Sequence, residues 1–432
     1  MSEAVSDRAW LQAMLDAEAA LARAEAGAGL FPAGTAETIA AGCRAERFDV
    51  AALGRAAVAT GTPVVPVVTA LRSALPDDAA GWVHRGATSQ DILDTAAMLV
   101  SRQALAVLVE GLDAVGGRCA ELAATHRSTV MAGRTLLQQA VPISFGLKCA
   151  GWLVALAEAR DRLDHIRRER LAVQLGGAAG TLAVLGPTAP AVLTSMAAAL
   201  GPVEPPMPWH TNRVWVAEIA AALGVTLGVA GKVANDVLLL AQTEVGEVGE
   251  GGGPGRGGSS TMPHKHNPVG AVAVTACVGR GQALVGVILR SMVQEHERAA
   301  GSWQAEWETL IELFTLTGTA VDRLGEVLDG LEVHPSRMRQ NLDRASALVM
   351  AESVVTTLGR RIDGAEARAL VEAAGRRAAE ADRPLVEELA RDDAVRAHLS
   401  PADLEAAVDP AGYLGATDHF IDRALGAWRQ GA

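Results

Sequence analysis

The sequence is poor in aromatic residues and in cysteine, and both shortages narrow the protein class. Aromatic side chains make up 3% of the 432 residues, although half of all residues are hydrophobic. Alanine, valine and leucine therefore carry the apolar content, and of these Ala and Leu favour helices. The four cysteines (Cys43, Cys119, Cys149 and Cys277) lie far apart without a CxxC pair, which argues against a zinc site or a disulfide framework. We therefore expect a reducing, cytoplasmic location.

Basic clusters and an apolar leader are also missing. The net charge is −12 and no basic stripe is present to neutralise phosphates, so no nucleic-acid partner is expected. Residues 1–7 are acidic and lack the apolar core of a signal peptide. The apolar stretch that most resembles a transmembrane helix, residues 214–231, contains Glu218 and is followed by Lys232. These charges indicate a buried helix, so no membrane partner is expected.

Helical periodicity dominates the chain, and strand-like alternation extends over no more than a few residues. A first amphipathic pattern covers residues 9–26, and longer ones with few breakers cover residues 94–126, 142–171, 214–249, 268–296 and 305–331. Helices of this length exceed the usual mean of about 11–12 residues and are typical of a long bundle, within one chain or between subunits. The high hydrophobic fraction indicates an oligomer with large apolar interfaces.

We predict an all-α fold made of three consecutive domains. The first is an N-terminal helical domain over residues 1–95, and the second is a central bundle of long helices over residues 96–335. The third, over residues 336–432, has shorter helices punctuated by Pro384, Pro401 and Pro410, and is predicted to be a small helical domain.

A glycine-rich stretch followed by a dense group of reactive side chains lies within residues 247–268. Residues 251–258 are all glycine except Pro254 and Arg256, which is typical of a connector or of a mobile active-site lid. The next nine positions hold hydroxyls, imidazoles, an ammonium group and an amide: Ser259, Ser260, Thr261, His264, Lys265, His266 and Asn267. A solvated linker seldom concentrates chemistry in this way, so the segment is predicted to belong to an active site.

Several common motifs do not fit this loop. Residues 253–258 match GxGxxG, but they follow a predicted helix, whereas the dinucleotide-binding motif follows a strand. The GK[ST] of a phosphate-binding P-loop, the HExxH of a zinc protease and the GxSxG of a nucleophile elbow are all absent from the sequence. We therefore expect neither a metal nor an organic cofactor.

Residues 258–268, GSSTMPHKHNP, resemble the GSSxMPxKxNP hallmark of the fumarase/aspartase superfamily. This superfamily contains fumarases, aspartases, argininosuccinate and adenylosuccinate lyases, and 3-carboxy-cis,cis-muconate cycloisomerases. Two more segments resemble its other regions in the same order, HRGATSQD at residues 84–91 and GRTLLQQA at residues 133–140. The resemblance covers almost the whole chain, and the segments RTLLQQAVPISFGLK, PWHTNRVWVAE and LSPADLEAAVDPAGYLG are similar to the cycloisomerase branch.

The resemblance implies a homotetramer with a core of long helices from all four subunits, in which three subunits contribute to each active site. It implies a small dicarboxylate or tricarboxylate substrate, with Ser259 as the proton-transfer residue and Lys265 stabilising negative charge. The implied substrate-binding residues are His84, Thr88, Ser89, Arg134, Thr135, Gln138, His210, Arg213, Ser260, Thr261, Met262 and Asn267. Taken alone, Thr88 and Ser89 have the simpler interpretation of helix caps.

The sequence departs from the family pattern at Leu136. Fumarases and adenylosuccinate lyases carry a histidine there, directly after GRT. Leucine cannot donate the proton that a poor leaving group needs, an effect of about 10²–10⁴ in rate. A substrate carboxylate needs no such acid, so Leu136 favours lactone closure or its reverse. Two further departures are His266, where this branch usually has Arg, and Val214-Trp215, where another charged pair is expected.

Other functions stay open at this point. Leu136 equally permits elimination of a stable anion, such as nitrite, from a substituted succinate. Adenylosuccinate lyase activity is disfavoured because its acid histidine is missing. A catalytically inactive scaffold protein is disfavoured because Ser259, Lys265 and Asn267 are all retained.

Overall fold

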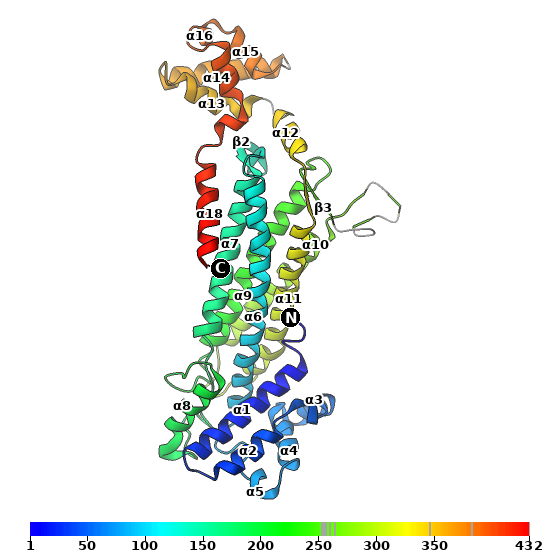
Figure 1. Ribbon diagram of the computed structural model, residues 1–432, viewed down its shortest axis with the longest axis vertical. Coiled ribbons are helices and arrows are strands. Elements are labelled where there is room, and N and C mark those ends of the chain that lie inside the picture. Colours follow the sequence, from blue (N-terminus) through cyan, green and yellow to red (C-terminus); the bar gives the residue numbers. More distant parts are fainter. Residues whose placement is uncertain (252–256, 259–260, 263–264, 345–346, 382, 432) are drawn as a thin grey trace. The chain divides into compact units, whose positions relative to one another are not determined.

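The computed structural model describes the whole chain except residues 252–256, 259–260, 263–264, 345–346, 382 and 432. Most described residues are helical, and the strands pair as two antiparallel two-stranded sheets, β1 with β2 and β3 with β4 (Figure 1). The all-α class is therefore confirmed in its coarse form, with two short two-stranded sheets added to it: β1 and β2 form a hairpin, and β3 pairs with the distant β4.

The elements follow in chain order. The helices are α1 (Asp7–Gly27), α2 (Ala33–Gly42), α3 (Val50–Thr60), α4 (Val64–Ser73), α5 (Asp77–Ala80), α6 (Ser89–Thr125), α7 (Phe145–Glu169), α8 (Ala189–Leu200), α9 (Val214–Leu240), α10 (Val269–Ser291), α11 (Ser302–Asp329), α12 (Pro335–Arg344), α13 (Ala351–Leu358), α14 (Gly364–Glu380), α15 (Leu385–Arg391), α16 (Asp393–Arg396), α17 (Pro401–Val408) and α18 (Thr417–Gly431). The strands are β1 (Val130–Thr135), β2 (Gln138–Ser144), β3 (Val248–Glu250) and β4 (Leu331–Val333).

The chain divides into two compact units, each built from separated segments. Unit 1 contains Met1–Leu112, Glu158–Gly231 and Val274–Asp322, and unit 2 contains Asp113–Ala157, Lys232–Ala273 and Arg323–Ala432. Helices α6, α7, α9, α10 and α11 each contribute one part to unit 1 and the rest to unit 2. This division differs from three consecutive domains over 1–95, 96–335 and 336–432, which stay a prediction.

The long helices predicted from periodicity are present, with shifts at their ends. Helix α9 stops at Leu240, short of the predicted residue 249, and the chain turns at Gly246, whose φ is +60°. Helix α7 starts at Phe145, after β2, so Pro142 lies in a strand and not in the first helical turn. Helix α9 ends in a turn that precedes β3, and β2 occupies the predicted start of α7; local periodicity revealed neither.

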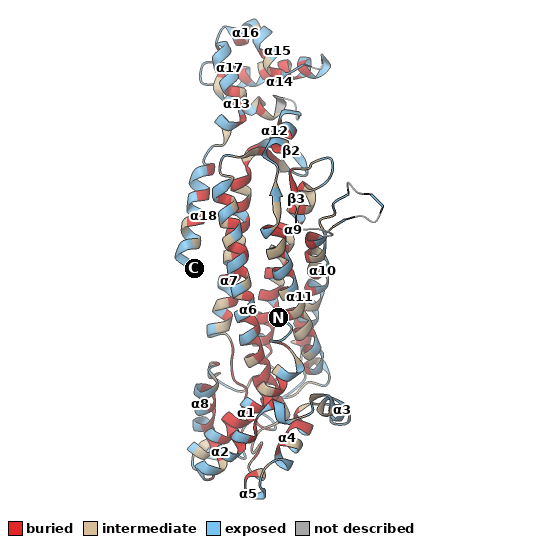
Figure 2. Ribbon diagram, turned by 45° about the vertical axis from the view of Figure 1, so that its right-hand side comes forward, coloured by how far each residue is buried: buried red, intermediate tan, exposed pale blue. Residues whose placement is uncertain are grey.

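Helices α6, α9 and α10 are long and apolar enough to cross a membrane by length and composition alone. The predicted buried helix at residues 214–231 lies in α9. Half of the most apolar 18-residue stretch of α9 is buried. Of these three helices, α10 is the least covered by the rest of the chain (Figure 2). Only 22% of its most apolar 18-residue stretch is buried, and its exposed apolar residues are Val269, Val272, Val287 and Leu289. One chain by itself therefore leaves an apolar face of α10 uncovered.

Helix α1 packs into unit 1 along a face rich in alanine and leucine. The Ser6 hydroxyl accepts a hydrogen bond from the Ala9 amide and caps the first turn, with Asp7 favourably placed at the positive end of the helix. The buried residues of α1 include two acids seven positions apart, Glu18 and Glu25. Because seven residues are about two turns, these acids share one side of the helix.

Glu25 is a fully buried acid with neither carboxyl oxygen hydrogen-bonded in the described part of the chain. Burial raises the pKa of Glu25 from its ordinary 4.5 to about 8, with the charge of Arg85 opposing the shift and that of Glu18 adding to it. Glu25 is therefore protonated at neutral pH. The stability that this proton provides is complete below pH 4.5 and is lost as the pH rises through 8.

Glu25→Gln is expected to leave stability unchanged at pH 5 and to raise it at pH 8 by about 2–4 kcal/mol, because the amide has no proton to lose. Urea unfolding of both proteins at the two pH values measures the difference. Glu37→Gln, at the exposed ion pair with Arg23 (side chains 64% and 52% exposed), is the control and should change little. A gain from Glu25→Gln that is equal at both pH values would contradict a protonated Glu25.

Candidate active site

The start of α6 is held by Asp91, a buried carboxylate in the first helical turn. Its Oδ2 accepts from the Thr88 amide at 2.9 Å and the Gly177 amide at 2.8 Å, and its Oδ1 accepts from the Gly176 amide at 2.9 Å. The His210 Nε2 lies 2.7 Å from Oδ1. Asp91 thus fixes the helix start that carries Thr88 and Ser89 against the loop around Gly176.

Glycine is required at two positions of this loop. A Cβ on Gly176 would lie 2.7 Å from the His210 ring, and one on Gly177 would lie 2.8 Å from the Gly86 carbonyl oxygen. Gly177 also has φ +69°, which a residue with a side chain rarely adopts. The backbone can therefore approach the turn before α6 closely enough to reach Asp91.

One turn further along α6, Asp94 joins a second buried charge network. The Arg213 guanidinium donates to both Asp94 oxygens, at 2.7 and 3.0 Å, and to Glu306 from Nε and Nη2. The Trp303 indole N–H donates to Asp94 Oδ1 at 3.0 Å. Burial raises the pKa of Glu306, and the Arg213 charge opposes this shift. A single cation therefore serves two buried carboxylates.

His210 and Arg213 were predicted to bind substrate, and the structure gives both of them protein partners. The His210 ring contacts Asp91, and the Arg213 side chain is 2% exposed between Asp94 and Glu306. Trp215, beside the unexpected Val214, lies under the Arg170 guanidinium at 4.4 Å. These contacts are structural, so substrate binding by His210 and Arg213 stays a prediction.

His84 lies in the turn before α6 and has left-handed backbone with φ +61°. Its Nδ1 is 2.6 Å from Glu18 Oε1, and the two side chains are 16% and 1% exposed. Burial lowers the pKa of His84, but the hydrogen bond and charge of Glu18, aided by Asp91, outweigh burial and raise it. A partly exposed imidazole on a strained backbone, four residues before Thr88, is a good candidate for a functional residue.

Arg298 is a candidate that the sequence analysis missed. Its Nη1 donates to the Thr88 hydroxyl at 3.1 Å, and its Nη2 donates to the Ala178 carbonyl at 2.9 Å. This places a guanidinium at the helix start where a substrate carboxylate was predicted to bind. Arg298 lies in a segment with several charged residues, QEHER at residues 294–298. Composition therefore did not distinguish Arg298 from its charged neighbours.

In unit 2, the second motif forms a tight hairpin between β1 and β2. Thr135 pairs with Gln138, and Leu136 and Leu137 make the two-residue turn with φ of +51° and +64°. Two successive left-handed residues are typical of a type I′ turn, where Asn-Gly is the usual choice. Leu136 is 97% exposed at the tip. The hairpin therefore presents strained apolar side chains to its surroundings.

Arg134 was predicted to bind substrate, and its contacts lie within unit 2. Its Nη1 and Nη2 donate to the two Glu247 oxygens at 2.9 and 2.6 Å, and the Asn341 amide donates to the same buried carboxylate at 2.9 Å. The pairing ties the hairpin to the segment that leads into β3. Its role toward substrate stays a prediction.

Lys148, near the start of α7, is a second residue that was not predicted. Burial lowers the pKa of its ammonium group, against the charge of Asp236 at 4.0 Å. Asp236 also accepts from the Trp152 indole N–H at 2.8 Å and pairs with Lys232. A lone charged residue in the apolar first half of α7, residues 145–157, was the available signal.

The signature segment is described in part. Ser259, Ser260, Pro263 and His264 lie outside the described residues, so the predicted roles of Ser259 and Ser260 stay predictions. Thr261, Met262, Lys265 and His266 are exposed. The Asn267 side chain donates to the Gly257 carbonyl at 2.9 Å, and Glu250 caps α10 by accepting from the Gly270 and Ala271 amides.

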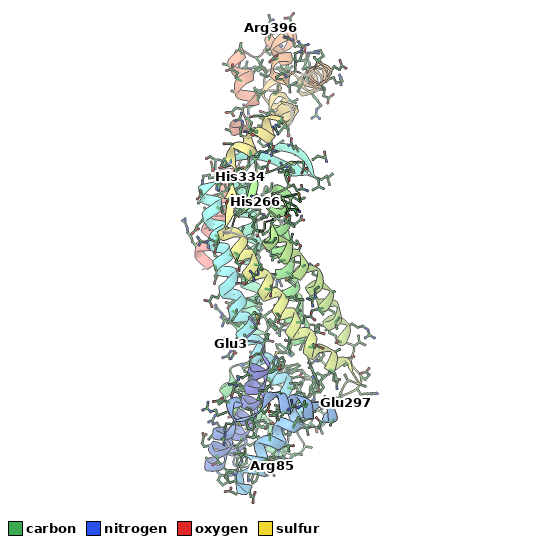
Figure 3. All side chains as sticks on the ribbon, turned by 90° about the vertical axis from the view of Figure 1, so that its right-hand side faces the viewer. Glu3, Arg85, His266, Glu297, His334 and Arg396 are labelled. Carbon is green, nitrogen blue, oxygen red and sulfur yellow. The ribbon has the colours of Figure 1, made fainter. Side chains whose placement is uncertain are left out.

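The predicted residues that the structure describes are divided between the two units. His84, Thr88, Ser89, His210 and Arg213 gather in unit 1 around the start of α6, in the same unit as Arg85 (labelled in Figure 3). The other predicted residues belong to unit 2, as does His266, which Figure 3 labels. They are Arg134, Thr135, Gln138, Thr261, Met262, Lys265 and Asn267.

The four cysteines are buried and free, and burial raises the pKa of Cys43 and Cys119 to about 12. These two thiols are therefore poor nucleophiles at neutral pH.

Comparison with known proteins agrees with these motifs. Residues 1–283 match the family model described as lyase, and residues 347–424 match the adenylosuccinate lyase C-terminus. The 3-carboxy-cis,cis-muconate cycloisomerase of Bradyrhizobium diazoefficiens is 46% identical over 428 residues, 98% of this chain and 95% of its relative. The nitrosuccinate lyase of Streptomyces davaonensis is 43% identical, and the aligned region covers 98% of this chain and 91% of that lyase.

A solved structure matches the fold. The crystal structure of 3-carboxy-cis,cis-muconate lactonizing enzyme from Pseudomonas putida aligns with a TM-score of 0.94 and 41% identity, over 100% of this chain and 97% of that one. This chain therefore shares the helical fold of that enzyme.

Arg213→Lys is expected to lower the free energy of unfolding by about 2–4 kcal/mol, because one ammonium group cannot bridge Asp94 and Glu306 as the guanidinium does. Arg170→Lys, at the half-exposed pair with Glu218, is the matched control and should cost less than about 1 kcal/mol. Chemical unfolding measures both. A substrate-binding Arg213 would instead show an unchanged stability and a raised KM.

Leu137→Gly is expected to stabilise the protein by about 1 kcal/mol, because glycine accepts the left-handed backbone of the turn without strain. Leu137→Ala keeps the Cβ and should give no gain, since this exposed side chain has little packing to lose. Thermal unfolding compares the three proteins. Equal stability of the glycine and alanine variants would show that the turn is unstrained.

Proposed function

Because this chain belongs to the lyase family of the fumarase/aspartase superfamily and is an enzyme, we propose that it is a 3-carboxy-cis,cis-muconate cycloisomerase. It would close 3-carboxy-cis,cis-muconate to the corresponding carboxymuconolactone. Several relatives that carry this name are 41–46% identical to it over most of the chain. Its place in the breakdown of protocatechuate, an aromatic compound, follows from that reaction.

The observation that favours this reaction within the superfamily is Leu136. A leucine at an exposed hairpin tip offers no proton donor at the position where other members carry an acid histidine. In lactone closure, a carboxylate oxygen of the substrate adds to a carbon–carbon double bond, and a proton is delivered to the carbon α to another carboxylate. No leaving group needs protonation in this direction, so a leucine at position 136 does not slow the reaction.

The remaining roles follow from the motifs. Ser259 transfers the proton at the α carbon, and Lys265 stabilises the charge that develops on the carboxylate. Thr88, Ser89 and the amides at the start of α6 bind a second carboxylate, supported by the positive end of the helix and by Arg298. A dicarboxylate or tricarboxylate substrate therefore matches the charges at the site.

The assembly is part of the proposal. The uncovered apolar face of α10 supports self-association, and a homotetramer with three-domain subunits would draw each active site from three subunits. The segment around Thr88, the Leu136 hairpin and the signature loop would then come from different chains. A cytoplasmic location suits an enzyme whose four cysteines are free.

A second candidate is elimination of nitrite from nitrosuccinate. The Streptomyces davaonensis relative carries that name at 43% identity, and nitrite, like a carboxylate, leaves as a stable anion. Leu136 permits both reactions equally, so the two are separated by assay.

Purified protein should consume 3-carboxy-cis,cis-muconate, measured as loss of the diene's ultraviolet absorbance. Ser259→Ala is expected to slow this reaction by about 10²–10⁴-fold, because the proton-transfer group is removed. Ser73→Ala, an exposed serine on α4, is the matched control and should retain full activity. Nitrite release from nitrosuccinate without diene loss would assign the chain to the elimination reaction instead.

A further inference from the structure

We propose that Glu18 is a positioning residue that keeps His84 as an imidazolium and directs its Nε2–H toward a carboxylate of the substrate. This inference deepens the proposed function and rests on it for the identity of the substrate. It concerns a buried acid on α1 that none of the three signature segments contains.

The geometry fixes which ring nitrogen is free. The His84 Nδ1 lies 2.6 Å from Glu18 Oε1, so Nδ1 carries a proton and donates it to the carboxylate. The other nitrogen, Nε2, has no hydrogen-bond partner in the described part of the chain, and the side chain is partly exposed. The ring therefore offers Nε2 alone to a ligand.

The Glu18 carboxylate depends on this one contact. Its side chain is almost fully buried, and its second oxygen has no partner among the described residues. A buried carboxylate with one hydrogen-bonded partner is stabilised best when that partner carries a positive charge. Glu18 and a protonated His84 thus form a buried pair whose exposed end is the cationic Nε2–H.

The backbone holds His84 in place from both sides. The carbonyl of the preceding Val83 accepts from Arg72 at 2.8 Å, and Gly86, two residues later, has φ +71° and lies against Leu185. His84 itself is left-handed, which is unfavourable for a residue with a Cβ. The turn then leads directly to Thr88 and the start of α6, where a carboxylate was predicted to bind.

Charged or titratable groups act on the His84 ring or lie near its partner Glu18. Glu18 and Asp91 favour the protonated ring, and Arg72 opposes it. Glu25, on the same side of α1, is protonated at neutral pH, and Arg85 lies over the Trp82 ring at 4.5 Å. Of these groups, Glu18 is the one in hydrogen-bond contact with the ring. Removing its charge should therefore release His84 to the effect of burial, which favours the neutral form.

The first experiment measures the protonation of His84 without using activity. Diethyl pyrocarbonate modifies a neutral imidazole and not an imidazolium, and mass spectrometry of the peptide that contains His84 gives its modification rate at each pH. The modification rate rises as His84 loses its proton, and the pH at half of this rise is its midpoint. This midpoint is expected at a higher pH in the full-length wild type than in Glu18→Gln. Glu25→Gln, at a second buried acid of α1, is the matched control and should move the midpoint much less than Glu18→Gln does, because Glu25 does not contact the ring and is neutral below about pH 8.

The second experiment uses the reaction. At pH 7.5, Glu18→Gln is expected to raise KM for 3-carboxy-cis,cis-muconate about tenfold with little change in kcat, because a charge-assisted hydrogen bond to the substrate is lost. At pH 5.5 the ring protonates without Glu18, so the KM of the variant should return toward that of the wild type. A purely structural Glu18 would not give this recovery at acid pH.

The outcomes separate the two proposals. If Glu18→Gln leaves the His84 midpoint where it is in the wild type, the inference is wrong whatever the substrate. If the midpoint moves but the wild type does not consume carboxymuconate, the pair exists and the proposed function fails. Should Glu18→Gln not fold, Glu18→Asp withdraws the carboxylate by one methylene, and an unchanged midpoint together with an unchanged KM would overturn the role of Glu18.

Discussion

Two buried carboxylates in the first turns of α6 hold together segments of unit 1 that are far apart in the sequence. Asp91 gathers the Thr88 amide, the amides of Gly176 and Gly177 and the His210 ring, while Asp94 gathers Arg213 and Trp303. A buried carboxylate that loses its donors is strongly destabilising, so each of these segments is fixed by the requirement to satisfy the acids. The Thr88 hydroxyl, Arg298 and the His84 imidazole are arranged around this framework, and their geometry depends on it.

The sequence predicted the long helices well and the contacts of the site poorly, for physical reasons. Apolar periodicity is a local signal, so the five long helices were found with errors at their ends. The hairpin at residues 130–144 was missed because its turn, Leu136-Leu137, lacks the Asn or Gly that marks such turns. Asp91 ends the motif HRGATSQD and Asp94 follows three residues later, but their partners Gly176, His210 and Arg213 lie 85 or more residues away along the chain. Spacing along the chain cannot show such contacts.

The arginines show why a motif alone does not assign a role. Arg134 and Arg213 stand in family segments and were predicted to bind substrate, and the structure pairs both with buried glutamate or aspartate. A guanidinium recognises a protein carboxylate and a substrate carboxylate with the same fork of donors, so the sequence cannot distinguish the two uses. Arg298 had no family segment to point to it, yet it reaches the Thr88 hydroxyl.

The hairpin tip bears on how this family acquires new reactions. Leu136 makes almost no contact within its own chain, since nearly all of its surface is exposed, and the strands beside it are fixed by their own ladder and by Arg134. Substitutions at such a position disturb folding little. Evolution can therefore exchange a proton donor for an inert side chain there, and so move between reactions that need an acid and reactions that do not, while the helical scaffold stays the same.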